Sequence, residues 1–220
     1  MKEVLNAQRR YWQNAFLRNP DMFGSKPSNP ATFAAELFKR ENKNRILELG
    51  GGQGRDTIHF ARHGFRVHML DYSKAAVTMV IDKCRESLLP VPVDALRHDV
   101  RKGLPFDDET FDACYSHMLY CMAFTTSELE LLSCEVRRVL RPEGLHVYTA
   151  RNTGDAHYRK GRYCGEDMYE INGFVVHFIS REKVEHLAKG YEIVSVDEFE
   201  EGELPRKLFR VTLRKTTVPP

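Results

Sequence analysis

The residues best placed to do chemistry follow a short apolar segment early in the chain. Glu48 lies within that segment, Arg55 begins the helix-like segment after it, and the turn between them holds Gly50, Gly51, Gly52 and Gly54. Glycines let a backbone turn tightly and let a ligand approach main-chain atoms closely. A strand that leads through such a turn into a helix ends in the crevice where open α/β sheets bind ligands. The stretch therefore predicts a ligand site.

The spacing of these glycines narrows the kind of ligand. Counted from Gly50, the dinucleotide fingerprint G-x-G-x-x-G requires a small residue where this chain has Arg55. The chain contains no G-K-[ST] sequence, so a P-loop is excluded as well. A carboxylate at Glu48 suits a cationic ligand better than a diphosphate. The pattern E-x-G-x-G-x-G therefore favours a positively charged small molecule over a dinucleotide.

The rest of the chain alternates short apolar runs with helical patterns, which is typical of βαβ units on a parallel sheet. We expect helices over residues 55–63, 73–87 and 127–140, the first ending at Gly64. A short helix follows Ser180. The final run alternates apolar and charged residues, which predicts an antiparallel edge hairpin. The expected strands are residues 45–50, 66–71, 93–99, 111–116, 145–150, 191–196 and 207–215.

These elements and motifs together resemble the class I S-adenosylmethionine-dependent methyltransferases. Glu48 to Gly54 is similar to motif I of that family, and acidic residues follow at the ends of the next two strands. The 140–144 turn resembles the family's L-[KR]-P-G-G, with Glu143 in place of the first glycine. Gly54, Arg55 and the overall layout are similar to the TehB-like and thiopurine-type small-molecule enzymes. The resemblance implies a Rossmann-like, doubly wound seven-stranded sheet of order 3-2-1-4-5-7-6, with strand seven antiparallel.

The resemblance also implies S-adenosyl-L-methionine as cofactor and assigns residues to it. Asp71 would accept both ribose hydroxyls, and Asp99 with Val100 would meet the adenine. Each acid also has a simpler interpretation: Asp71 as a partner of a helix cap at Ser73, and Asp99 as a surface ion pair. Arg55 either holds the methionine carboxylate or is a solvated helix residue. The full set of expected cofactor contacts is Tyr11, Glu48, Gly50, Gly51, Gly52, Gly54, Arg55, Asp71, Tyr72, Asp99, Val100 and Ser116.

The segment after the fourth strand is where this family brings the methyl group to its acceptor. His117 and Tyr120 are therefore candidates for orienting an acceptor or taking its proton, with packing as the alternative role for both. A sulfonium methyl reacts by direct in-line displacement, so no covalent enzyme intermediate is required. The acceptor is expected to be a small molecule with a thiol, a chalcogen or an amine.

Two regions outside the core motifs are expected to enclose the site. Residues 1–35 would form an N-terminal helical cap over the cofactor, or alternatively a staple to the core. Residues 36–220 would form the methyltransferase domain, interrupted by a polar, aromatic loop at 152–172. A loop this long inside a compact domain is usually functional. We expect it to be a substrate lid or pocket wall, with a surface excursion as the alternative.

Composition excludes several other classes of protein. The chain has 220 residues, enough for one domain with a large core. Its 33 Lys and Arg against 31 Asp and Glu leave a formal charge of +2, too even for a dedicated nucleic-acid binder. The sequence has no apolar run long enough to span a membrane and no signal peptide pattern, so a cytoplasmic protein is expected. No zinc-type pairing of His or Cys indicates a metal site.

Two functions from other classes remain open at this point. A cofactor-binding regulator without catalysis would bind S-adenosylmethionine and turn nothing over. A nicotinamide-dependent oxidoreductase would bind NAD despite Arg55. The expected assembly is a monomer or a homodimer, with no membrane or nucleic-acid partner.

Overall fold

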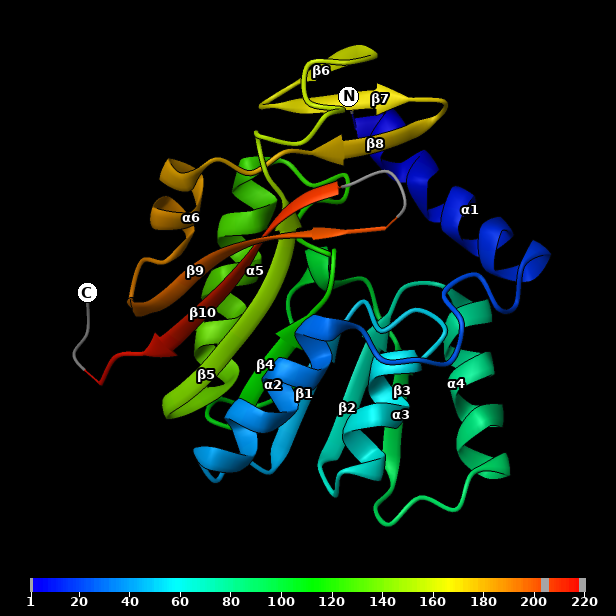
Figure 1. Ribbon diagram of the computed structural model, residues 1–220, viewed down its shortest axis with the longest axis vertical. Coiled ribbons are helices and arrows are strands. Elements are labelled where there is room, and N and C mark those ends of the chain that lie inside the picture. The colour runs from blue at the N-terminus through cyan, green and yellow to red at the C-terminus, as the bar shows by residue number, and fades with distance from the viewer. Residues whose placement is uncertain (1, 203–205, 218–220) are drawn as a thin grey trace.

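A computed structural model describes residues 2–202 and 206–217 and contains a seven-stranded sheet with helices on both faces (Figure 1). Five strands run parallel in the order β3-β2-β1-β4-β5, and β10 and β9 continue the sheet antiparallel to β5 and to each other. Counting main-sheet strands along the chain, this is the order 3-2-1-4-5-7-6. The expected Rossmann-like topology is therefore confirmed. The strands are β1 (Arg45–Leu49), β2 (Arg66–Asp71), β3 (Val93–Arg97), β4 (Phe111–Ser116), β5 (Leu140–Arg151), β9 (Tyr191–Glu201) and β10 (Arg206–Lys215).

Most helices begin at a side chain that caps their free backbone N–H groups. Ser28, Ser73 and Ser180 each accept a hydrogen bond from the backbone three residues on. Thr125 and Glu128 form a reciprocal capping box at the start of the longest helix on the sheet. The helices are α1 (Lys2–Arg18), α2 (Asn29–Arg40), α3 (Arg55–Arg62), α4 (Lys74–Glu86), α5 (Thr126–Val139), α6 (Arg181–Leu187) and the 3₁₀ turn η1 (Val100–Lys102).

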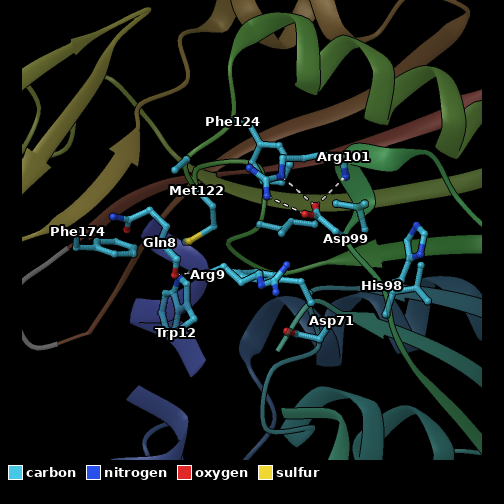
Figure 2. Close-up of a pocket in the computed structure, with 16 residues that line it drawn as sticks. Gln8, Arg9, Trp12, Asp71, His98, Asp99, Arg101, Met122, Phe124 and Phe174 are labelled. Atoms are coloured by element: carbon cyan, nitrogen blue, oxygen red, sulfur yellow. Dashed lines mark hydrogen bonds and ion pairs between the residues drawn. The ribbon is translucent and has the colours of Figure 1, made fainter. Parts of the chain in front are cut away.

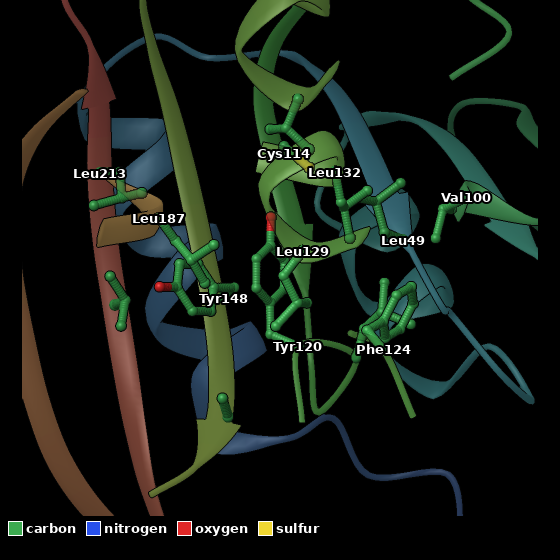
Figure 3. Packing of buried hydrophobic residues seen from close by; sticks show 14 of the residues in the cluster. Leu49, Val100, Cys114, Tyr120, Phe124, Leu129, Leu132, Tyr148, Leu187 and Leu213 are labelled. Atoms are coloured by element: carbon green, nitrogen blue, oxygen red, sulfur yellow. The ribbon is translucent and has the colours of Figure 1, made fainter. Parts of the chain in front are cut away.

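Side-chain alternation along β1 divides the core into two layers. Ile46 faces α2 and α3, where it packs in one apolar cluster with Phe38 and Phe60. Leu47 and Leu49 face the opposite way and pack with residues of α5 and α6 in the larger cluster drawn in Figure 3. Burial of both faces explains why the strands of the parallel part read as nearly continuous apolar runs.

The segment expected to be a loop at 152–172 contains two short strands, so the expectation of a loop throughout is corrected. It contains β6 (Arg162–Gly165) and β7 (Met168–Ile171), which pair with β8 (Phe174–His177) in a three-stranded antiparallel sheet. Each strand has only four residues, too few for an alternating pattern to stand out in the sequence. The buried side chains of Met168 and Val175 anchor this small sheet on the domain.

Helix α1 bridges the small sheet and the main sheet. It lies against β8 at one end and against the start of α4 at the other, where Phe16 packs on Ala75 and Ala76 (Figure 1). The expected boundary between residues 35 and 36 falls inside α2, whose buried face packs in the core of the main sheet. Of the N-terminal segment, α1 therefore lies over the carboxyl ends of the strands while α2 is part of the domain itself. Within the described residues, no helix is both long and apolar enough to cross a membrane.

Candidate functional site

Two adjoining cavities open at the carboxyl ends of β1, β2 and β4, beneath α1 and β8. The larger has a volume of about 640 Å³ and the smaller about 40 Å³. Figure 2 shows the smaller one, between Trp12 and Phe174 on one side and Asp71 and Asp99 on the other. The residues that line both cavities are Trp12, Gly50, Asp71, Tyr72, Leu119, Met122 and Phe174.

The glycine turn supplies the floor of the larger cavity through Gly50, Gly51 and Gly52. Gly52 has a φ of +53°, a backbone region that favours glycine, and its N–H donates to Asp71 Oδ2 at 3.0 Å. Gly54 lines neither cavity. It has a φ of +83°, and a Cβ there would lie 2.6 Å from Val80 Cγ2, so its role is to let the turn before α3 pass close to α4.

Asp71 is a buried carboxylate at the carboxyl end of β2. Its Oδ1 accepts from the N–H of Ser73 at 2.8 Å, while Oδ2 accepts from Gly52. Burial raises the pKa of Asp71 to about 6, so the group is mostly ionised at neutral pH. Each oxygen keeps a further acceptor site, and the residue lines both cavities. The arrangement fits a ligand that offers two neighbouring hydroxyl groups.

Glu48 lies deeper, with 2% of its surface exposed, on the wall of the larger cavity. Thr57 Oγ1 donates to its Oε2 at 2.5 Å. Burial and the nearby charge of Asp56 raise the pKa of Glu48 to about 8, so the carboxyl is protonated at neutral pH. A cation placed in the cavity would favour its ionised form.

The smaller cavity is bounded by the start of η1. Asp99 caps this turn by accepting from the N–H of Arg101 at 3.2 Å, and the Arg101 guanidinium grips the same carboxylate with contacts of 3.0 and 2.7 Å (Figure 2). Burial acts to raise the pKa of Asp99, but the hydrogen bonds and charge of Arg101 outweigh it and hold that pKa below its usual value. Val100 and Phe124 complete an apolar wall. Asp99 and Val100 thus reach the cavity as expected.

Arg55 faces the larger cavity rather than bulk solvent. Its guanidinium lies 5.6 Å from the ring centroid of Phe23. Its nitrogens are 3.7 Å from Oδ1 of Asp56 and 3.7 Å from Oε1 of Glu201. Arg55 Nη1 also donates to the carbonyl of Phe23 at 3.5 Å. Because both carboxylates lie farther away than a hydrogen bond, the remaining N–H groups can reach an anionic ligand group.

Helix α1 is held over the site by polar and aromatic contacts. The side-chain amide of Gln8 donates to the carbonyl of Gly173 at 3.0 Å and accepts from the N–H of Val175 at 3.2 Å. The Tyr11 ring lies 5.4 Å from that of Phe174, centroid to centroid. Tyr11 lines the larger cavity and Tyr72 lines both, so both expected contacts are placed there.

His117 stands on the opposite wall, in a turn immediately after β4. Its Nδ1 lies 2.9 Å from Thr149 Oγ1, and its Nε2 lies 3.2 Å from Oε2 of Glu201. The next residue, Met118, has a φ of +63°, and its N–H donates to the same Thr149 oxygen at 2.9 Å. Positive φ at a non-glycine residue is uncommon and costs free energy. Thr149 therefore holds a strained turn that aims His117 into the cavity.

Besides Gly54, the structure keeps two of the expected site residues, Ser116 and Tyr120, away from the pocket. Tyr120 is fully buried in the core, where its ring stacks on Tyr148 with centroids 4.2 Å apart (Figure 3). Ser116 is also fully buried, lines neither cavity, and its Oγ has no hydrogen-bond partner among the described residues. The turn at Met118 redirects the chain, so that His117 faces the cavity and Tyr120 faces the core. Both assignments are therefore corrected: these residues pack.

Several lining residues escaped the sequence interpretation. Arg151 ends β5, so the signal that singled out Asp71, a charged residue at the carboxyl end of a strand, could have found it. Glu201 ends an antiparallel strand, where no such rule applies.

We call the wall formed by Glu48, Gly50–Gly52, Asp71 and Tyr72 the glycine-loop side. The facing set is the His117 side, formed by His117, Arg151, His157, Glu201 and Arg206. Across residues 2–202 and 206–217, no cluster of three or more His, Cys, Asp or Glu is arranged to hold a metal ion.

Comparisons with known proteins agree with the methyltransferase resemblance of the sequence. Residues 46–144 match a family model described as a methyltransferase domain. The putative methyltransferase YqeM of Bacillus subtilis is 31% identical over 114 residues, which cover 50% of this chain and 44% of that protein. The chain thus spans less than half the length of this curated relative.

Solved structures agree with the fold. The 1,6-didemethyltoxoflavin-N1-methyltransferase of Burkholderia thailandensis, solved with S-adenosylhomocysteine, superposes with a TM-score of 0.76 at 14% identity, covering 98% of this chain and 90% of that one. TehB from Haemophilus influenzae gives a TM-score of 0.69 at 13% identity, covering 93% of this chain and 67% of that one. The fold expected from the resemblance is confirmed.

Proposed function

We propose that the chain, whose residues 46–144 match a family model described as a methyltransferase domain, is a class I S-adenosylmethionine-dependent methyltransferase acting on a small molecule. The observation that carries the proposal is the glycine-loop side of the pocket. Asp71 hydrogen-bonds the glycine turn while keeping acceptor sites toward the cavity. Asp99 and Val100 lie at the adjoining apolar slot.

These residues match the parts of the cofactor one by one. Asp71 is suited to the ribose hydroxyls, because a carboxylate can accept from both. The slot beside Val100 is suited to adenine, with Asp99 as acceptor for its amino group. The carboxyl of Glu48 and the donors of Arg55 line the larger cavity, where an amine and a carboxylate would lie. We assign Gly50, Gly51 and Gly52 to the same ligand and give Gly54 a packing role.

When bound, S-adenosylmethionine supplies an electrophilic methyl group on sulfur. The chain's own contribution is to hold the acceptor in line and to exclude water. Helix α1 and β8 are joined over one side of the pocket through Gln8, Tyr11 and Phe174, which shields that side from solvent. His117 lines the cavity on the opposite wall, where we place the acceptor.

A small acceptor is supported by the size of the larger cavity, about 640 Å³, which must also hold part of the cofactor. The solved structure from Burkholderia thailandensis contains bound 1,6-didemethyltoxoflavin, the compound for which that enzyme is named. Both a thiol or chalcogen and an amine fit the pocket volume. We propose a monomer or homodimer that needs neither a membrane nor a nucleic acid.

Calorimetric titration with S-adenosylmethionine, S-adenosylhomocysteine and NAD tests the cofactor. We expect micromolar binding of the two sulfur compounds, about −8 kcal/mol, and none of NAD. NAD binding in their place would support an oxidoreductase. Binding without turnover on any acceptor would support a regulator instead.

The same titration in two buffers of different ionisation enthalpy supplies an independent readout. The amine of the cofactor should favour ionised Glu48, whose pKa is raised to about 8 in the free protein. Binding at pH 7 should then release a proton, and the Glu48→Gln variant should release less. Identical proton release by the wild type and Glu48→Gln would show that Glu48 does not contact the cofactor amine.

A further inference from the structure

Three side chains from separate elements form a hydrogen-bonded chain on the His117 side of the pocket. Thr149 comes from β5, His117 from the turn after β4, and Glu201 from the end of β9. The contacts are 2.9 Å from Thr149 Oγ1 to His117 Nδ1 and 3.2 Å from His117 Nε2 to Glu201 Oε2. Thr149 is fully buried, whereas Glu201 lines the larger cavity.

Hydrogen accounting fixes the direction of these bonds. Thr149 Oγ1 already accepts from the N–H of Met118, so its own hydrogen needs an acceptor. Among the described residues, the acceptor within reach of Thr149 is Nδ1 of His117. Neutral His117 therefore carries its hydrogen on Nε2 and donates it to Glu201. It has no lone pair left with which to take a proton from an acceptor.

Glu201 does have that capacity. Its Oε2 is engaged by His117, but its Oε1 is 3.7 Å from Arg55 Nη2, beyond hydrogen-bond distance. The hydrogen bond from His117 keeps the pKa of Glu201 below its usual value despite burial, so the carboxylate is charged at neutral pH. The charged and titratable groups that face it are Arg55 of α3, His117 after β4 and Arg206 of β10.

We propose that Glu201 accepts the proton of a nitrogen nucleophile, so that the methyl acceptor is an amine or a ring N–H compound. This inference rests on the methyltransferase function proposed above. The nitrogen lone pair forms the bond to the methyl carbon, and the carbon–sulfur bond breaks with its electron pair left on sulfur. The N–H proton then passes to Oε1 of Glu201. His117 and Thr149 act as positioning residues.

The charge of Glu201 favours nitrogen over a thiol. A neutral nitrogen becomes cationic as it gains a methyl group, so a nearby carboxylate stabilises the transition state more than the ground state. A thiol reacts as its anion, and the same carboxylate disfavours an anion within a few ångströms. The rings of Tyr11, Trp12 and Phe174 on the facing wall also suit a flat compound that acquires positive charge.

The first experiment pairs acceptors with variants. Small aromatic compounds that differ only in bearing an amine, a ring N–H, a thiol or a hydroxyl are screened for formation of S-adenosylhomocysteine. We expect turnover within the nitrogen series. Glu201→Gln should lower kcat about 100-fold or more while the Kd for S-adenosylmethionine changes less than about twofold. Glu200→Gln, the same change at an exposed neighbour on β9, is the matched control and should match the wild type.

The second experiment tests the positioning role without turnover. Nitrogen-15 NMR of the His117 ring in the full chain should report the Nε2–H tautomer. Thr149→Ser should retain both that signature and the activity, because the hydroxyl remains. Thr149→Val, similar in shape, should lose the tautomer preference and about tenfold in kcat, with the Kd for S-adenosylmethionine unchanged.

Specific outcomes overturn the proposal. Preferred turnover of thiols, or full kcat in Glu201→Gln, would show that Glu201 takes no proton from nitrogen. A parallel loss of S-adenosylmethionine affinity in Glu201→Gln would make it a cofactor residue instead. An Nδ1–H tautomer of His117 would show that the hydrogen bonds run from His117 to Thr149 instead. Failure to bind S-adenosylmethionine at all would instead contradict the methyltransferase function, a result that the binding titration distinguishes.

Discussion

The glycine-loop side of the pocket is built from one short stretch of chain, whereas the His117 side combines residues from the turn after β4, from β5 and the segment that follows it, and from β9 and β10. Glu48, the glycines and Asp71 occupy two consecutive strands and the turn after the first. His117 and Glu201 meet only because β9 and β10 extend the sheet beyond β5. The first side uses backbone geometry and buried carboxyls, and the second uses side chains paired across distant elements.

This difference teaches which part of the pocket can vary. The glycine turn between β1 and α3 is tied to the interior of the fold, since Gly54 lies against the buried Val80 of α4. The His117 side depends on strand ends and loops, which tolerate change more easily. We therefore expect variants on the glycine-loop side to affect cofactor binding and stability, and those on the His117 side to affect turnover.

The largest expected effect on the glycine-loop side follows removal of the Asp71 carboxylate. Asp71→Ala should raise the Kd for S-adenosylhomocysteine about 100-fold, because hydrogen bonds to charged groups contribute about 1.5–3 kcal/mol each. Calorimetry measures the change, and Asp82→Ala on the exposed face of α4 is the control. A Kd within threefold of the wild type would show that Asp71 does not hold the cofactor.

Replacement of the packing glycine should have an effect of similar size, on stability instead of binding. Gly54→Ala combines a positive φ with a Cβ 2.6 Å from Val80, and should lower the free energy of unfolding by about 3 kcal/mol. Gly64→Ala has a similar φ but nothing within 4 Å of its Cβ, so it should cost about 1 kcal/mol. Urea denaturation of both variants separates the cost of a positive φ from the cost of the steric overlap between the new Cβ and Val80. Equal losses would mean that the close approach of Gly54 to Val80 is unimportant.

The buried carboxyl of Glu48 should make stability depend on pH. Its pKa of about 8 in the folded chain lies above the ordinary value of 4.5, so the folded state keeps a proton that the unfolded chain releases between these values. Stability should therefore fall by about 2 kcal/mol from pH 6 to pH 8 and level off above that. Denaturation at both pH values should reveal the loss in the wild type and a smaller one in Glu48→Gln. A pH dependence shared by both proteins would assign it to another group.

The smallest effect on turnover is expected from a change at Tyr120, which lies in the core and not in the pocket. Tyr120→Phe keeps the stacked ring and loses only a 3.5 Å contact to Ser133 Oγ, so kcat should stay within about twofold. His117→Ala serves as the positive control in the same turnover assay. A tenfold loss of kcat in Tyr120→Phe would show that Tyr120 takes part in the reaction, which would contradict its assignment to the core.

Most of the fold could be predicted from the sequence because its elements follow local rules. Helix α4 begins at Ser73, and β2 ends at Asp71, as apolar pattern and capping predict. The strands of the small sheet could not be predicted in the same way, because four-residue strands carry too little pattern. Their pairing depends on contacts with α1 through Gln8 and with the core through Met168.

The site residues also divide into those that local sequence rules predict and those that depend on tertiary contacts. Asp71 and Asp99 could be found from their positions at strand ends, and Arg151 could have been found by the same rule. Ser116 and Tyr120 were misassigned because the sequence does not reveal the positive φ of Met118, which decides which neighbour faces the pocket. Glu201 was missed because its partner His117 comes from a distant part of the chain.

The sequence by itself determined the alternation of strands and helices, the glycine turn and the acids that follow it. These features depend on residues close together in the chain, whose periodicity and backbone preferences act locally. Only the tertiary structure decided which residue after β4 enters the pocket, how α1 and β8 cover it, and that Thr149, His117 and Glu201 form one chain. Those outcomes depend on how separate elements pack, and no local pattern encodes the distance between two side chains that meet across a sheet.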